Sequence, residues 1–148
     1  MSYFPDQKIL LTTTTGELFL PARIIYRVHD REELLRKLRR LKCMEFDEEK
    51  RRWTWNYEFE AKDLVFPPAY DAITPDCRPL ILASCHEVEA NRLHVYVRST
   101  LRLTKFLVFF DKRIPRRCAE GEFFDEYNLI TVVDPRKGMP TPEDYFRD

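Results

Sequence analysis

The sequence predicts an α+β domain in which a twisted antiparallel sheet carries two helices on one face. Short segments with alternating apolar and polar residues recur along the chain, as in half-buried strands. Two longer segments carry apolar residues at helical spacing. Prolines crowd 67–79 and 135–142, where they rule out central strands and helix interiors. We therefore expect one domain over 1–133, with a proline-rich connector at 67–78 and a loosely ordered tail at 134–148.

The first half, residues 8–66, opens with segments rich in β-branched and apolar residues at 8–14 and 17–20, around a turn at Thr15-Gly16. Residues 23–28 alternate in the manner of a third strand. We therefore expect three short strands before the first helix.

The first helix is expected to begin after Asp30. This carboxylate can accept a hydrogen bond from the free N–H groups of the first turn, and Glu33 follows at the spacing of a capping box. One face of the helix is an apolar stripe, formed by Leu34, Leu35, Leu38 and Leu41. We expect this stripe to face the sheet.

A hairpin is expected after this helix. Residues 43–46 alternate, and 47–50 are too polar for a core and indicate a turn. The strand that follows, over 52–60, has the clearest alternation in the chain. One of its faces carries four aromatic residues, Trp53, Trp55, Tyr57 and Phe59.

The second half, residues 79–133, starts with strands at 80–88 and 92–98 around a tight turn. A three-residue loop centred on Ala90 would place His86 opposite His94. A two-residue loop would instead place Glu87 opposite His94 and Glu89 opposite Arg92. We prefer the two-residue loop because it pairs opposite charges across the hairpin, and because it places apolar residues of the two strands together, namely Leu80, Leu82 and Val88 with Leu93, Val95 and Val97.

A second helix is predicted over 100–112, with Ser99 or Thr100 as its N-cap and Pro115 beyond its end. Its core stripe comprises Leu103, Phe106, Leu107 and Phe110. Strands are expected at 119–127 and 129–133. The two halves thus share the order β-β-α-β-β, which raises the hypothesis of an internal pseudo-duplication.

Composition excludes several classes of protein. The chain has 148 residues, 44% of them hydrophobic, so it is not disordered. Its 25 basic and 25 acidic residues give zero net charge, which argues against non-specific coating of nucleic acid. Residues 1–6 lack the basic and apolar regions of a secretory signal, and no apolar run approaches the length of a membrane span. We expect a cytoplasmic protein with four reduced cysteines.

No familiar catalytic motif is present, and we expect no cofactor and no metal. Cys85-His86 and His94 offer at most three zinc ligands without a defined fourth. One alternative is a small metal-dependent nuclease that uses Asp47, Glu60 and Lys62, because two carboxylates and a lysine can hold a cation and the attacking water.

A second alternative is nucleic-acid binding by basic helix faces, since clustered cations neutralise phosphates. The residues concerned are Arg36, Lys37, Arg39, Arg40, Arg102, Lys105, Lys112, Arg113, Arg116 and Arg117.

The leading prediction is a non-catalytic protein-interaction module, either a homodimer or a subunit of a larger assembly. Apolar residues surround most of the second helix, and aromatic residues stand in the polar tail. Such surplus apolar surface is typical of an interface. The residues expected to bind a partner are Leu101, Val108, Phe109, Tyr145 and Phe146.

Overall fold

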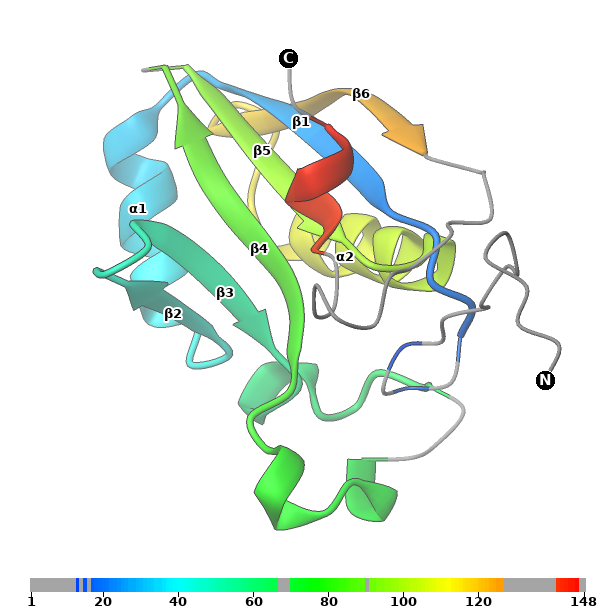
Figure 1. Ribbon diagram of the computed structural model, residues 1–148. Helices are drawn as coiled ribbons and strands as arrows, with labels where there is room; N and C mark the ends of the chain where they lie inside the picture. The colour runs from blue at the N-terminus through cyan, green and yellow to red at the C-terminus, as the bar shows by residue number, and fades with distance from the viewer. Residues whose placement is uncertain are drawn as a thin grey trace, which may run out of the picture.

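The computed structural model describes residues 13, 15, 17–66, 70–89, 91–126 and 141–146. It contains strands β1 (Ala22–Val28), β2 (Met44–Asp47), β3 (Arg52–Asn56), β4 (Ile81–Val88), β5 (Arg92–Val97) and β6 (Ala119–Glu126), helices α1 (Arg31–Arg40) and α2 (Thr100–Arg113), and 3-10 turns η1 (Phe59–Ala61), η2 (Tyr70–Ala72), η3 (Pro75–Cys77) and η5 (Pro142–Tyr145). The strands form one open antiparallel sheet in the order β2-β3-β4-β5-β1-β6. Both helices lie behind this sheet in Figure 1, whereas η5 lies in front of it. The predicted α+β class with an antiparallel sheet and two helices is therefore confirmed.

The two connections that contain a helix pass different numbers of strands. The connection through α1 joins β1 to β2 and passes three intervening strands, whereas the connection through α2 joins β5 to β6 and passes only β1. Equivalent halves would make equivalent connections. This topology therefore does not show the internal duplication that the order of elements suggested.

Side chains from both helices enter one core on the helical face of the sheet. Leu34 and Leu38 of α1 and Phe106 of α2 belong to the same buried cluster as Trp55 of β3. The Trp55 ring lies 5.1 Å from the Phe106 ring in an edge-on contact. Burial of a large apolar side chain contributes about 1.5–3 kcal/mol, so this layer supplies much of the stability.

Both predicted helix starts are confirmed. The Asp30 carboxylate accepts a hydrogen bond from Glu33 N at 3.0 Å, and Ser99 Oγ accepts one from Arg102 N at 3.1 Å. The Glu33 carboxylate does not complete a capping box, because the Asp30 N–H group donates to the Cys118 carbonyl at 3.1 Å, and Glu33 instead accepts from Arg117 at 2.8 Å. Helix α2 ends before Pro115, as predicted.

Strand β3 is shorter than the sequence predicts. It ends at Asn56, next to an irregularity in its pairing with β4, and a 3-10 turn follows. Tyr57 is still buried, but Phe59 has a φ of 50° and is 58% exposed. Alternation alone placed Phe59 in the core. The backbone changes direction after Asn56, and this places the Phe59 side chain outside the core.

The predicted register of the β4–β5 hairpin is wrong. His86 lies opposite His94 and Val88 opposite Arg92, which leaves a three-residue loop. This register places Cys85 against Val95 on the buried face. The predicted register placed Leu82 and Val88 on the face of Val95, whereas the observed register places the buried residues Ala83 and Cys85 there. Burial of these residues outweighs the exposed charge pairs on which the prediction also relied.

The expected strand at 17–20 does not form, apart from one bridge at Leu18. Side-chain hydrogen bonds hold this segment instead, because the Glu17 carboxylate accepts from Thr13 Oγ1 at 2.7 Å and from Ser99 Oγ at 2.9 Å. The strand expected at 129–133 and residues 8–12 lie outside the described residues.

The described residues of the C-terminal segment, 141–146, include the 3-10 turn η5. Turn η5 contacts β5, while residues 134–140, 147 and 148 lie outside the description. All four cysteines are free thiols, and Cys77 alone among them is exposed. In the described part of the chain, neither helix combines the length and apolar character needed to cross a bilayer.

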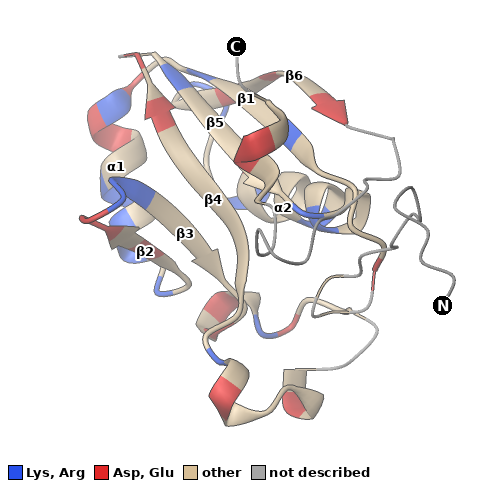
Figure 2. Cartoon of the chain, viewed as in Figure 1, with Lys and Arg blue, Asp and Glu red and all other residues tan. Residues whose placement is uncertain are grey.

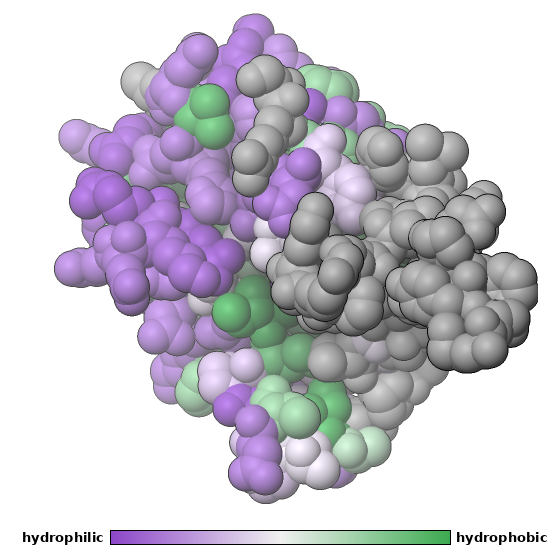
Figure 3. All heavy atoms as spheres, viewed as in Figure 1, coloured by the Kyte–Doolittle hydropathy of each residue, from purple (hydrophilic) through white to green (hydrophobic). Residues whose placement is uncertain are grey.

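The face seen in Figure 3 is hydrophilic over the β2–β3 hairpin and more hydrophobic around the start of β4. We call the sheet face opposite the helices the polar face. It carries Arg23, Ser84, His86, His94 and Tyr96, which the strand register places on one side.

Candidate functional site

Strand β6 forms one edge of the sheet. It pairs antiparallel with β1 and, among the described residues, has no strand on its other side. The pairing is irregular between Ile25 and Tyr26, so that Glu122 has no opposite residue on β1. Its carboxylate instead lies 2.9 Å from Arg92 and 3.3 Å from Arg27.

Two phenylalanines of β6 are exposed on opposite faces of the sheet. Phe124 lies opposite Ile24 on the helical face, and Phe123 lies opposite Ile25 on the polar face. Their side chains are 58% and 49% exposed. A hollow of about 390 Å³ borders β6 beside α2, and another of about 550 Å³ borders it over the polar face.

Ion pairs fasten β6 to β1. The buried guanidinium of Arg23 donates two hydrogen bonds to the Asp125 carboxylate, at 3.2 and 2.9 Å. His29 Nε2 lies 2.9 Å from Glu120 Oε1. Strand β6 itself carries no cation and four carboxylates, Glu120, Glu122, Asp125 and Glu126.

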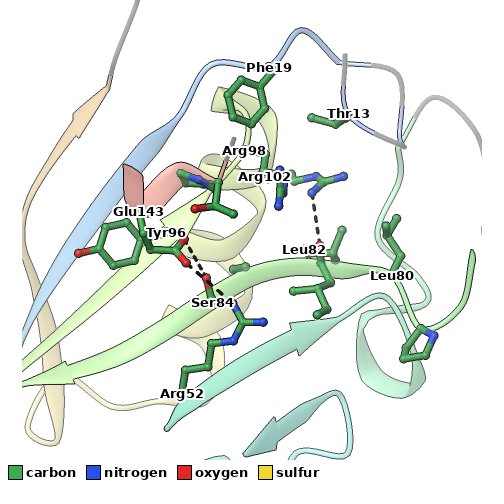
Figure 4. A pocket seen from close by; sticks show the side chains of 15 residues that line it. Thr13, Phe19, Arg52, Leu80, Leu82, Ser84, Tyr96, Arg98, Arg102 and Glu143 are labelled. Carbon is green, nitrogen blue, oxygen red and sulfur yellow. Dashed lines mark hydrogen bonds and ion pairs between the residues drawn. The ribbon is translucent and has the colours of Figure 1, made fainter. Parts of the chain in front are cut away.

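A second candidate site is a pocket of about 320 Å³ on the polar face, between β4, β5 and η5 (Figure 4). Three arginines from different elements line it together with one carboxylate. These are Arg52 of β3, Arg98 after β5, Arg102 of α2 and Glu143 of η5. We call it the arginine pocket.

Arg102 is the most buried cation of the pocket. Its Nε lies 3.3 Å from Glu17 Oε1, and it donates to Thr15 Oγ1 at 3.1 Å and to the Ile81 carbonyl at 3.4 Å. Burial lowers the pKa of Arg102 to about 10; attraction to Glu17 opposes this and outweighs the smaller lowering by the positive charge of Arg98, but it does not outweigh burial. Arg102 remains charged at neutral pH.

Glu143 projects from η5 into the pocket (Figure 4). Ser84 Oγ donates to it at 3.2 Å, while Arg52 and His86 lie 3.8 Å from its carboxylate. Burial alone would raise the pKa of Glu143, but hydrogen bonds and the charge of His86 outweigh burial and hold this pKa below its usual value. The pocket therefore stabilises an anion.

The residues predicted to bind a partner do not share one surface. On α2, Phe109 is buried with its ring 5.3 Å from Trp55, Leu101 is half-buried and Val108 is 53% exposed. On the opposite side of the sheet, the Tyr145 ring lies 6.1 Å from Phe19 and the Phe146 ring 6.2 Å from Tyr96.

The predicted basic residues have several different environments. Arg102 is buried, and the Arg113 guanidinium stacks 3.7 Å from the centre of the Phe109 ring. Lys37 and Arg117 both lie near the carboxylate of Glu33. Figure 2 shows basic residues on α1. Of the remaining predicted residues, Lys105 is half-buried and the others are exposed, namely Arg36, Arg39, Arg40, Lys112 and Arg116.

The structure does not bring the three predicted nuclease residues together. Glu60 accepts hydrogen bonds from the backbone N–H groups of Lys42 and Cys43, both at 2.9 Å, just before β2. Asp47 is the last residue of β2, and four extended residues span about 13 Å. The Lys62 ammonium lies 4.7 Å from the centre of the Tyr70 ring.

The described residues contain no group of three or more side chains placed to hold a metal ion. Cys85 is buried on the helical face, whereas the adjacent strand residue His86 faces the other way.

Comparison of this chain with models of known protein families, with curated proteins and with solved structures found no match. A function must therefore be inferred from the candidate sites themselves. Sequence reasoning missed both candidate sites. A signal for the first was present, because consecutive phenylalanines in a strand must point to opposite faces, as Phe123 and Phe124 do. No local signal marks Glu143.

Proposed function

We propose that this chain is a non-catalytic protein-interaction module that binds an extended segment of a partner protein beside β6. One observation carries the proposal: an eight-residue edge strand exposes Phe123 and Phe124 on its two faces, each beside a hollow. An added strand gains affinity from main-chain hydrogen bonds and specificity from alternate side chains. The two hollows would receive those alternate side chains.

The charge of β6 favours a particular partner. Two copies of β6 side by side would place the four carboxylates of each copy along one seam, and like charges across a strand pair are destabilising. The side chains that pair with three of these carboxylates come from β1, His29 and β5, not from β6 itself. A segment with alternating basic and apolar residues would instead supply opposite charge and fill the hollows. We therefore propose a basic–apolar extended segment of another protein as the partner, in preference to a second copy.

A peptide of sequence Lys-Val-Arg-Phe-Lys-Val, labelled with a fluorophore, provides the test by fluorescence anisotropy. We expect it to bind more tightly than the same peptide with glutamates in place of its basic residues. The double change Phe123→Ser and Phe124→Ser should weaken binding at least tenfold, because it removes the exposed apolar contacts on both faces. Phe46→Ser, which removes a half-exposed phenylalanine from β2, is the matched control and should leave binding unchanged.

Equal binding of the basic and acidic peptides would contradict the proposal. So would equal losses in the β6 and β2 variants. Light scattering that shows dimers disrupted by the β6 changes would assign the edge to a second copy instead.

A further inference from the structure

The arginine pocket collects positive charge on a part of the sheet away from β6. Arg52, Arg98 and Arg102 line it, and Glu143 is the one carboxylate among the described lining residues; Glu17 lies beside Arg102, and Asp47 lies 3.8 Å from Arg52. Burial lowers the pKa of Arg98; attraction to Glu143 opposes burial, and the positive charge of Arg52 and the attraction to Asp144 have smaller effects of opposite sign. The negative charge of Glu143 stabilises the Arg98 guanidinium more than the positive charge of Arg52 destabilises it, and an oxyanion of a ligand at the same place would stabilise it in the same way.

The pocket also has an apolar wall. Leu80, Leu82 and Phe19 line it beside the arginines, and its volume of about 320 Å³ falls in the range of small-molecule sites. A ligand that fits this lining has an anionic group at one end and an apolar body at the other.

Glu143 supplies an anionic group to this pocket from within the chain. Its carboxylate takes a hydrogen bond from Ser84 at 3.2 Å and lies 3.8 Å from both Arg52 and His86, and it comes from a turn that is far in sequence from the strands beneath it. An oxyanion of a ligand would meet the same donors.

We propose that the arginine pocket binds the phosphate or carboxylate group of a small organic molecule, and that Glu143 is the internal carboxylate with which this ligand competes. The site does not depend on the proposed interaction at β6. Arginines are suited to it, because their planar forks donate paired hydrogen bonds to oxyanions.

The test uses isothermal titration calorimetry with phenyl phosphate, benzoate and the neutral benzyl alcohol, at constant ionic strength. We expect at least one of the two anions to bind and benzyl alcohol to bind at least tenfold more weakly. Tighter binding of phenyl phosphate would assign a phosphate ligand, and tighter binding of benzoate a carboxylate ligand.

Four variants separate a ligand site from a purely structural cluster. Arg52→Gln and Arg98→Gln should each weaken anion binding at least tenfold. Arg92→Gln is the matched control on the polar face, since Arg92 pairs with Glu122 outside the pocket, and it should change binding less than twofold. Glu143→Gln should tighten binding several-fold, because it removes the competing charge. A structural role alone would not produce that gain.

Three results would overturn the proposal: no anion binding by the native protein and by Glu143→Gln, an equal loss in Arg92→Gln, or equal binding of benzyl alcohol. Thermal melts of each variant confirm that the fold is retained. The double change at Phe123 and Phe124 should leave anion binding unchanged, so failure of this proposal and failure of the β6 proposal are distinguishable.

Discussion

The two edges of the sheet differ in how they meet solvent. Strand β2 has four residues and runs into the charged turn at 48–51, and its Phe46 ring packs 5.3 Å from the Trp53 ring. Strand β6 has eight residues and exposes two phenylalanines that lie on opposite faces. Short, charged edges resist the addition of another strand, whereas long edges with apolar side chains accept one. Length and side-chain placement therefore make β6, and not β2, the edge suited to binding.

The largest expected difference between the edges concerns their ion pairs. Asp125→Asn should lower the free energy of unfolding by about 2 kcal/mol, because the buried guanidinium of Arg23 loses the charge that compensates it. Asp47→Asn should cost less than about 0.5 kcal/mol, since Asp47 lies 3.8 Å from Arg52 and is partly solvated. Urea unfolding of both variants measures the difference. Equal losses of unfolding free energy in the two variants would contradict a stabilising role of the Arg23–Asp125 ion pair.

A smaller effect is expected at the β2 edge in acid. Burial raises the pKa of Glu60, but hydrogen bonds from the N–H groups of Lys42 and Cys43 outweigh it and lower this pKa overall. A carboxyl with a lowered pKa stabilises the fold above its unfolded pKa, and the contribution is lost as the pH falls through the folded value. Glu60→Gln should therefore cost about 1 kcal/mol at pH 7 and less at pH 3, because the contribution of the carboxylate decreases as the pH falls toward its folded pKa. Urea unfolding at the two pH values tests this, and a loss independent of pH would contradict it.

The smallest effect is expected from the exposed cations of α1, which packs near β2. The double change Arg36→Glu and Arg40→Glu should alter binding of the basic peptide at β6 less than twofold, because both residues belong to the opposite end of the sheet. The same variant tests the nucleic-acid alternative, which predicts weaker, salt-sensitive retention on heparin. Unchanged retention would dispose of that alternative.

Local patterns predicted the elements better than the sites. The helix N-caps at Asp30 and Ser99 and the strand β2 after α1 can all be predicted from residues that are close in sequence. Phe59 and the β4–β5 register were predicted wrongly because each depends on how a strand meets its neighbours. The arginine pocket could not be predicted as a site, because Arg52, Arg98, Arg102 and Glu143 meet only after folding. At β6, the consecutive phenylalanines were a signal in the sequence, but the position of the strand at a sheet edge was not.

The sequence by itself determined the α+β class, the antiparallel strands and the capped helices, because each depends on periodicity and hydrogen bonds within a few residues. The tertiary structure decided the strand order, which places β6 at an edge and exposes Phe123 and Phe124. It also brought the Glu143 carboxylate to within 3.2 Å of Ser84, 59 residues away in the chain. Contacts of that range depend on which apolar faces bury one another, and no local pattern encodes that choice.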